Sequence, residues 1–143
     1  MRTIRAVMFM NEENGLRGGK AYAADTARAG ERHLAVIESD RGGFAPRGFT
    51  IEGDSAILPR VRRWAALFDS LQAGELTRGY SGVDISPMVA KGVPGFGLDV
   101  ESQRYFDYHH SANDTIDKVN PRELELGAIA EALLSYLLSE EGL

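Results

Sequence analysis

The sequence predicts an α/β fold in which helices cover both faces of a mostly parallel sheet, giving three layers. The first observation is a strand, helix and strand in succession: residues 3–10 are apolar and β-forming, residues 16–29 are alanine-rich, and residues 34–37 are apolar again. A helix that joins two strands favours their parallel pairing. The other observations are a third apolar strand at residues 93–100 and a leucine-striped helix from residue 121 to about residue 140.

The composition indicates a single globular domain spanning residues 1–143. Hydrophobic residues make up 43% of the chain and charged residues 26%, which is enough apolar material for one core. The net charge of −5 and the absence of any basic run argue against nucleic acid as a partner. No apolar run reaches the roughly 18 residues of a membrane span, so we expect no membrane partner. Because cysteine is absent, any metal must be held by His, Asp and Glu.

The middle of the chain is less regular. The glycine-rich stretch at residues 42–54 predicts an irregular strand or loop. Apolar residues recur at helical spacing over residues 56–73, which predicts a core-facing helix, and residues 84–92 predict a short one. Before the last helix, Asn120 is placed as an N-cap, with Glu123 reaching back to complete a capping box.

Acidic and imidazole side chains gather in three places. Glu12 and Glu13 follow the first predicted strand, Asp40 follows the second, and the segment YHHSANDT occupies residues 108–115. Open α/β sheets build their sites at the carboxyl ends of the strands. A zinc hydrolase needs His and carboxylate ligands, together with a further carboxylate that takes a proton from the metal-bound water. Two adjacent glutamates can divide the ligand and base roles between them.

Each of these residues also has a simpler interpretation. Glu12 and Glu13 suit the first turn of a helix, where the helix dipole favours acids. Asp40 precedes an Arg-Gly-Gly sequence and suits a turn. His110 suits a loop with a hydrogen bond to the backbone, and Asp84 suits the N-cap of the short helix. Taken one at a time, these positions do not separate a site from ordinary local structure.

Taken together, the segments resemble a known family. The sequences RTIRAVMFMNEENGLRGG, VIESDRGG and YHHSANDT follow one another as in the C-terminal part of the catalytic domain of the M28 zinc peptidases. The pattern HHSxxDT is most similar to the branch containing carboxypeptidase Q, also called plasma glutamate carboxypeptidase. The resemblance implies a three-layer, zinc-peptidase-like (phosphorylase/hydrolase-like) sheet that is incomplete on its N-terminal side. It also implies hydrolysis of peptide bonds in small peptides by a metal-activated water.

The resemblance also implies roles for individual residues. Glu12 corresponds to the general base, and Glu13 and His110 correspond to ligands of one zinc. Asp40 corresponds to a ligand of a second zinc. For Asp114 two roles stay open: it orients His110 from outside the ligand set, or it supports the loop.

The chain departs from the family pattern in one respect. The two-metal site of the family also uses an upstream His-x-Asp segment, which supplies a histidine and the aspartate that bridges the metals. His33 lies at the opposite end of its predicted strand from Asp40 and is a poor substitute. We therefore expect a C-terminal fragment, or a truncated reading frame, that binds zinc weakly and has little activity alone.

Two further functions compete with this prediction: an M20-type deacylase or dipeptidase, and a non-catalytic, peptidase-like interaction domain. The HHSxxDT pattern favours M28, and the joint presence of the three site segments argues against a domain that needs only its fold. An incomplete sheet leaves a strand edge uncovered, so we expect a dimer or larger species. Related enzymes are usually exported, which implies a periplasmic or secreted parent protein, although no targeting segment in residues 1–143 shows it.

Overall fold

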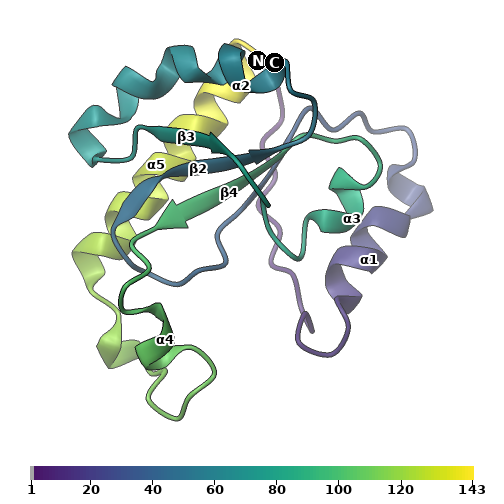
Figure 1. The fold of residues 1–143 in the computed structure, drawn as a ribbon. Helices are drawn as coiled ribbons and strands as arrows, with labels where there is room; N and C mark the ends of the chain where they lie inside the picture. The colour runs from purple at the N-terminus through teal and green to yellow at the C-terminus, as the bar shows by residue number, and fades with distance from the viewer. Residues whose placement is uncertain (1) are drawn as a thin grey trace.

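An open sheet of four strands forms the centre of the computed structural model, which describes residues 2–143 (Figure 1). The strand order is β1-β4-β2-β3. Strands β1 and β4 pair in parallel, as do β2 and β3, whereas β2 and β4 are antiparallel. The strands are β1 (Val36–Glu38), β2 (Pro46–Glu52), β3 (Glu75–Arg78) and β4 (Gly95–Val100). Helices surround this sheet, so the α/β class and the mostly parallel pairing expected from the sequence are confirmed.

Within residues 2–143 the chain also forms five α-helices and three 3₁₀ segments, of which α2, η2 and α3 lie between strands. No helix within residues 2–143 combines the length and the apolar character that crossing a bilayer requires. The α-helices are α1 (Arg17–Ala24), α2 (Ile57–Val61), α3 (Ser86–Val89), α4 (Tyr105–Tyr108) and α5 (Pro121–Glu140). The 3₁₀ segments are η1 (Thr26–Arg28), η2 (Arg62–Leu71) and η3 (Ile116–Lys118).

The core lies between one face of the sheet and the layer formed by α2, η2 and α5. Phe49 of β2 meets Phe68 of η2 edge to face, with ring centroids 5.9 Å apart. The indole Nε1 of Trp64 donates to Glu141 Oε2 at 3.0 Å and so joins η2 to the end of α5. The buried apolar residues of this core include Phe49, Ile51, Val61, Trp64, Phe68, Leu76, Phe96, Leu98, Val100, Ala130, Leu134, Leu137 and Leu138.

The opposite face of the sheet is lined by small residues, which lets a loop and two short helices approach closely. A Cβ atom at Gly97 of β4 would lie 2.3 Å from the carbonyl oxygen of Ser81, so only glycine fits there. In α1, a Cβ at Gly19 would lie 2.3 Å from the carbonyl oxygen of Asp84. The glycine in α1 therefore serves close packing against this loop. The helix predicted over residues 16–29 is shorter than expected, because α1 ends at Ala24.

The prediction of a strand at residues 3–10 is wrong. The segment is extended, but across residues 2–143 no backbone hydrogen bond involves residues 3–9. Its ends are held: Arg2 exchanges hydrogen bonds with Ser139 of α5, and the Met10 carbonyl accepts from Gly18 of α1 at 3.0 Å. A strand needs a neighbouring strand to satisfy its backbone, and this segment has none beside it.

Other elements also differ from expectation. The stretch at residues 42–54 contains strand β2, which pairs with β3 and β4 on its two sides and has an irregular register against β4 between Pro46 and Gly48, so the irregular-strand alternative is confirmed. The helix expected over residues 56–73 divides into α2 and the 3₁₀ segment η2. The Asn120 cap is confirmed, since its side chain accepts from the backbone N–H groups of Arg122 and Glu123. The carboxylate of Glu123, however, binds Arg104 instead of completing a capping box.

We predict that Phe49→Ala destabilises the fold by about 3–5 kcal/mol, because it leaves a cavity at the contact with Phe68. Urea unfolding followed by the fluorescence of Trp64 measures this difference. Leu67→Ala is the matched control, since Leu67 is 52% exposed and its loss costs no more than about 0.5 kcal/mol. Equal effects of the two substitutions would contradict the placement of the core.

Candidate active site

Glu12 and Glu13 lie in a tight turn between the extended N-terminal segment and α1. The backbone N–H groups of Gly15 and Leu16 donate to the Glu12 carbonyl oxygen at 3.0 and 2.8 Å. Helix α1 begins only at Arg17 and has no acid in its first turn. The helix-dipole interpretation of the two glutamates is therefore wrong, and the turn presents both side chains beyond the helix.

His110 is held by stacked rings at the end of α4. The ring of His109 lies between those of Tyr105 and His110, with centroid distances of 4.5 and 3.9 Å. The backbone N–H of His109 donates to the carbonyl of Tyr105 at 2.9 Å, which ends α4. His110 itself has a φ of 54°, a left-handed conformation that residues with a Cβ rarely adopt. Stacking and backbone together fix the direction of the His110 ring.

The structure brings His110 and Glu13 together across a long sequence separation. His110 Nε2 lies 2.8 Å from Glu13 Oε1. Both side chains are largely exposed, with relative exposures of 62% and 67%, so the pair stays open to solvent and to ligands. An imidazole nitrogen and a carboxylate oxygen held this close form a donor pair of the kind that zinc takes.

Negative charge gathers around Glu12. Burial raises the pKa of Glu12 above its ordinary value, and the nearby carboxylates of Glu13, Asp40 and Asp84 raise it further. The positive charge of protonated His110 acts in the opposite direction. The carboxyl ends of the N-terminal segment and of β1 therefore meet at one place, and this place attracts protons or cations.

Asp84 belongs to this acidic cluster, although the sequence predicted it as the N-cap of the short helix. Its side chain makes no capping hydrogen bond, because α3 begins at Ser86 and is preceded by Ile85. Across residues 2–143, Asp84 Oδ1 is buried without a hydrogen-bond partner. Burial raises the pKa of the Asp84 carboxyl, and the charge of Asp40 adds to this effect. The residue is thus an unsatisfied carboxylate beside the predicted site.

Glu38 organises the loop that leads to Asp84, a role the sequence did not reveal. Glu38 is only 8% exposed, and its carboxylate accepts hydrogen bonds from the backbone N–H groups of Val83, Asp84 and Ile85, at 3.2, 3.2 and 3.0 Å. Gly82 is required beside it, because its φ is 150° and a Cβ there would lie 2.1 Å from Glu38 Oε2. The sequence feature that could have indicated this role is the position of Glu38, an acid directly after the apolar residues 34–37. The loop that it binds includes the sequence SGVD at residues 81–84.

A cavity of about 390 Å³ lies next to Asp40. Aromatic side chains and the glycines of the sheet form much of its wall, and the guanidinium of Arg41 reaches Asp99 at 3.2 Å nearby. The lining includes Glu38, Asp40, Tyr80, Gly97, Tyr105 and Phe106. A mainly apolar hollow beside charged groups is a common form of small-ligand site.

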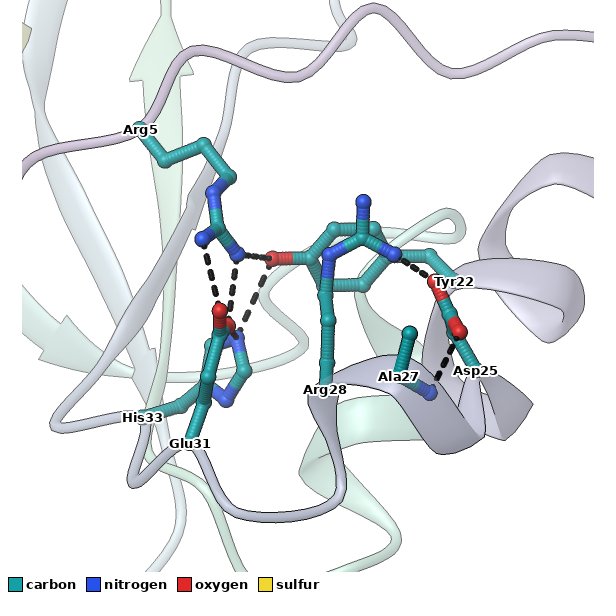
Figure 2. Close-up of polar contacts among 7 residues, drawn as sticks. All are labelled: Arg5, Tyr22, Asp25, Ala27, Arg28, Glu31 and His33. Atoms are coloured by element: carbon teal, nitrogen blue, oxygen red, sulfur yellow. Dashed lines mark hydrogen bonds and ion pairs between the residues drawn. The ribbon is translucent and has the colours of Figure 1, made fainter.

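Neither His33, which the sequence indicated as a poor ligand, nor Asp114, a predicted supporting residue, binds the Glu13–His110 pair. His33 does not approach the site: its Nε2 lies 3.1 Å from the Tyr22 hydroxyl and 4.0 Å from Glu31 (Figure 2). Asp114 is exposed, and across residues 2–143 its carboxylate makes no hydrogen bond to His110. Its role in orienting His110 stays a prediction, as do the roles of the four principal residues.

The residues that the structure brings together match part of a zinc site. Glu13 and His110 have suitable donor atoms, but zinc takes about four ligands, of which catalytic sites draw about three from the protein. Within residues 2–143, no three His, Asp or Glu side chains converge closely enough to hold a metal ion. The donor set of this chain as it stands does not fit a complete zinc centre.

Comparison with known proteins agrees with this combination of fold and site residues. The model of peptidase family M28 matches residues 1–137. Carboxypeptidase Q of Bos taurus is 28% identical over 139 residues, and that of Homo sapiens is 29% identical, each match covering 97% of this chain and 29% of the relative. A crystal structure of a peptidase M28 precursor from Shewanella amazonensis SB2B superimposes with a TM-score of 0.82 at 30% identity, covering 92% of this chain and 30% of that one.

The chain belongs to peptidase family M28. It is thus a peptidase-family domain with an α/β fold, as its strands and site residues indicated. The chain spans about 29% of the length of the carboxypeptidase Q relatives it matches.

We predict that Glu38→Ala destabilises the protein by about 1–3 kcal/mol, because backbone N–H groups of the loop lose their buried acceptor. Urea unfolding monitored by circular dichroism gives the difference. Glu140→Ala removes an exposed carboxylate at the end of α5 and should change stability by no more than about 0.5 kcal/mol. A Glu38 variant as stable as this control would show that the loop does not depend on Glu38.

Stability should also depend on pH through Glu38. Burial raises the pKa of the Glu38 carboxyl above its ordinary value of 4.5, so the folded state binds this proton more tightly than the unfolded state. The resulting stabilisation is complete below pH 4.5 and is lost as the pH rises through the raised pKa.

The measurement is the free energy of unfolding of the wild type and of Glu38→Gln at a series of pH values. The advantage of the wild type should shrink as the pH rises above 4.5. An advantage that grows over this range would mean that the hydrogen bonds to the carboxylate outweigh its desolvation.

Proposed function

We propose that this chain supplies part of the active site of a zinc-dependent peptidase that hydrolyses peptide bonds of small peptides. The observation that supports this proposal is the 2.8 Å contact between Glu13 and His110, beside the acidic cluster around Glu12. The family assignment supports the same reaction class. The activity of the complete protein is part of the proposal, because the chain spans only a fraction of its relatives.

Each residue of the cluster has a distinct role in this proposal. Glu13 and His110 hold one zinc ion, and Asp40 contributes to a second metal position. Glu12 is the general base, since burial and the neighbouring acids raise its pKa and so favour its accepting a proton. When bound, zinc supplies a water of lowered pKa as the nucleophile. Glu12 would accept the proton of that water and would pass it to the amine that leaves the peptide bond.

The ring stack explains how this chain positions its imidazole ligand. His110 could not keep its ring against Glu13 if the left-handed backbone at residue 110 relaxed. Stacking on His109 and Tyr105 opposes that relaxation. The cavity beside Asp40 is suited to one side chain of the substrate, with Tyr105 and Phe106 in its wall.

The isolated chain is proposed to bind zinc weakly and to have little activity. Two ligands at one position, and one at another, leave both metals short of the usual coordination. Without a bridging anion, two zinc ions held close together would repel each other. The further ligands would come from polypeptide outside residues 1–143.

We predict that zinc binds to the purified chain at one weak site and that Glu13→Ala or His110→Ala weakens this binding at least about tenfold, since each removes one of two ligands. Isothermal titration calorimetry with zinc chloride measures the affinity, and hydrolysis of dipeptides is assayed in parallel. His33→Ala is the matched control, because its imidazole lies in the separate cluster with Tyr22 and Glu31.

The outcomes separate the alternatives. Zinc binding that survives both site substitutions but not His33→Ala would place the metal elsewhere and sink the proposal. Absence of any zinc binding would favour the non-catalytic interaction domain. Rapid zinc-dependent hydrolysis by the wild type alone would contradict the weak, incomplete site.

A further inference from the structure

Helix α4 leads directly to His110, but the helix is too short to hold its own position. It has only four residues, and a single helical turn is not stable by itself. The direction of the His110 ring therefore depends on the side chains that attach α4 to the rest of the molecule. Tyr105 supports the ring of His109, whereas Arg104 and Tyr108, one turn apart, contact other elements.

The helix that Arg104 begins does not explain why an arginine occupies this position. Arg104 is the N-cap residue of α4, yet within residues 2–143 its side chain makes no capping hydrogen bond. Ser, Thr, Asp and Asn are the usual N-caps, and positive charge is disfavoured at the start of a helix. The side chain contacts neighbouring elements instead, which indicates a role in the tertiary structure.

Arg104 attaches α4 to the first turn of α5 (Figure 1). Its Nη2 donates to both carboxylate oxygens of Glu123, at 2.9 and 2.8 Å. Its Nε lies 3.6 Å from Glu101 Oε2. The side chain of Glu123 is 22% exposed and that of Glu101 is 17% exposed, so both carboxylates are largely shielded from water. This shielding strengthens the pairing relative to a fully exposed ion pair.

The guanidinium of Arg104 also lies over the ring of Phe44, in the loop between Asp40 and β2. The guanidinium carbon is 5.1 Å from the ring centroid. The same ring is stacked with that of Tyr108, at a centroid distance of 6.3 Å and an interplanar angle of 26°. Two residues one turn apart at α4 thus hold a single ring of the loop that follows Asp40.

The same loop also packs against the residues around the start of α5. A Cβ atom at Gly43 would lie 2.8 Å from Val119 Cγ1 and 3.4 Å from Leu124 Cδ1, so the loop backbone is in close contact with these side chains. The loop, α4 and the start of α5 are therefore each in contact with the other two. Arg104 takes part in two of these three contacts.

We infer that Arg104 is a positioning residue for the candidate active site. By fixing α4 to α5 and to the loop after Asp40, it keeps the His110 ring against Glu13. Because it acts through Phe44, it also couples the position of Asp40 to that of the pair. The placement of His110 concerns the metal-free protein, whereas the consequence for zinc binding rests on the proposed function.

NMR spectroscopy of the zinc-free chain tests this inference, because the chain has 3 histidines whose ring protons can be assigned separately. In the wild type we expect nuclear Overhauser effects between the His110 ring and the Glu13 side chain. We also expect an upfield shift of the His110 ring protons, caused by stacking on His109. Arg104→Gln removes both the charge and the planar group, so both signals should decrease sharply, while circular dichroism shows that the fold remains.

Arg122→Gln is the matched control, because Arg122 also pairs with a glutamate of α5, Glu125 at 2.6 Å, but this pair is exposed. It should leave the His110 signals unchanged. The ring of His33, in a separate cluster beside α1, is an internal reference that neither substitution should move. Unchanged His110 signals in Arg104→Gln would overturn the inference, and so would an equal change in Arg122→Gln or at His33.

A second substitution, Phe44→Leu, tests the route through the loop. Leucine keeps apolar packing against the core but removes the ring between the guanidinium and Tyr108. The His110 signals should therefore decrease in Phe44→Leu as they do in Arg104→Gln. Signals like those of the wild type would contradict the action of Arg104 through Phe44.

Zinc calorimetry gives a further readout. Arg104→Gln should weaken zinc binding about tenfold, as the loss of groups that orient a metal ligand commonly does, whereas Arg122→Gln should not. Zinc binding that Arg104→Gln leaves unchanged would overturn the inference. A wild type that binds no zinc would contradict the proposed function alone, because the NMR signals of the zinc-free chain still decide whether Arg104 positions His110.

Discussion

The buried carboxylate of Glu38 is the contact on which the arrangement around the candidate site depends. It lies at the last residue of β1 and accepts hydrogen bonds from three consecutive N–H groups of the loop before α3. This contact holds the loop against the sheet, where Gly97 leaves room for it. The same loop carries Asp84, against which α1 packs through Gly19. One desolvated acid thereby links β1, α3 and α1.

That linkage brings together the ends of two segments that carry the candidate site residues. The turn with Glu12 and Glu13 lies between the extended segment and α1, and Asp40 lies just beyond β1. When α1 packs on the loop, the turn approaches Asp40, and His110, directly after the end of α4, meets Glu13. Like charges gathered in this way raise the pKa of Glu12 and repel one another. The cluster is therefore costly for stability and suited to binding a cation.

The extended N-terminal segment is held differently from the strands of the sheet. The four strands hold together because β4 and β2 share a core with α5. The extended N-terminal segment is attached instead by side chains, through Arg2, Arg5 and Phe9. Its backbone stays open beside an open strand edge. A groove lies between residues 2–9 of this segment and strand β1.

The sequence by itself determined the α/β class and the final helix with its Asn120 cap. It also indicated Glu12, Glu13, Asp40 and His110 as candidate site residues, whose roles stay predictions. These follow from local patterns: apolar periodicity, capping chemistry and motif order. Only the tertiary structure decided that residues 3–9 stay unpaired and that the glycine-rich stretch forms a strand, β2, paired on both sides. It also decided that Glu38 is buried. Pairing and burial depend on which neighbours the rest of the chain supplies, and local sequence contains no record of those neighbours.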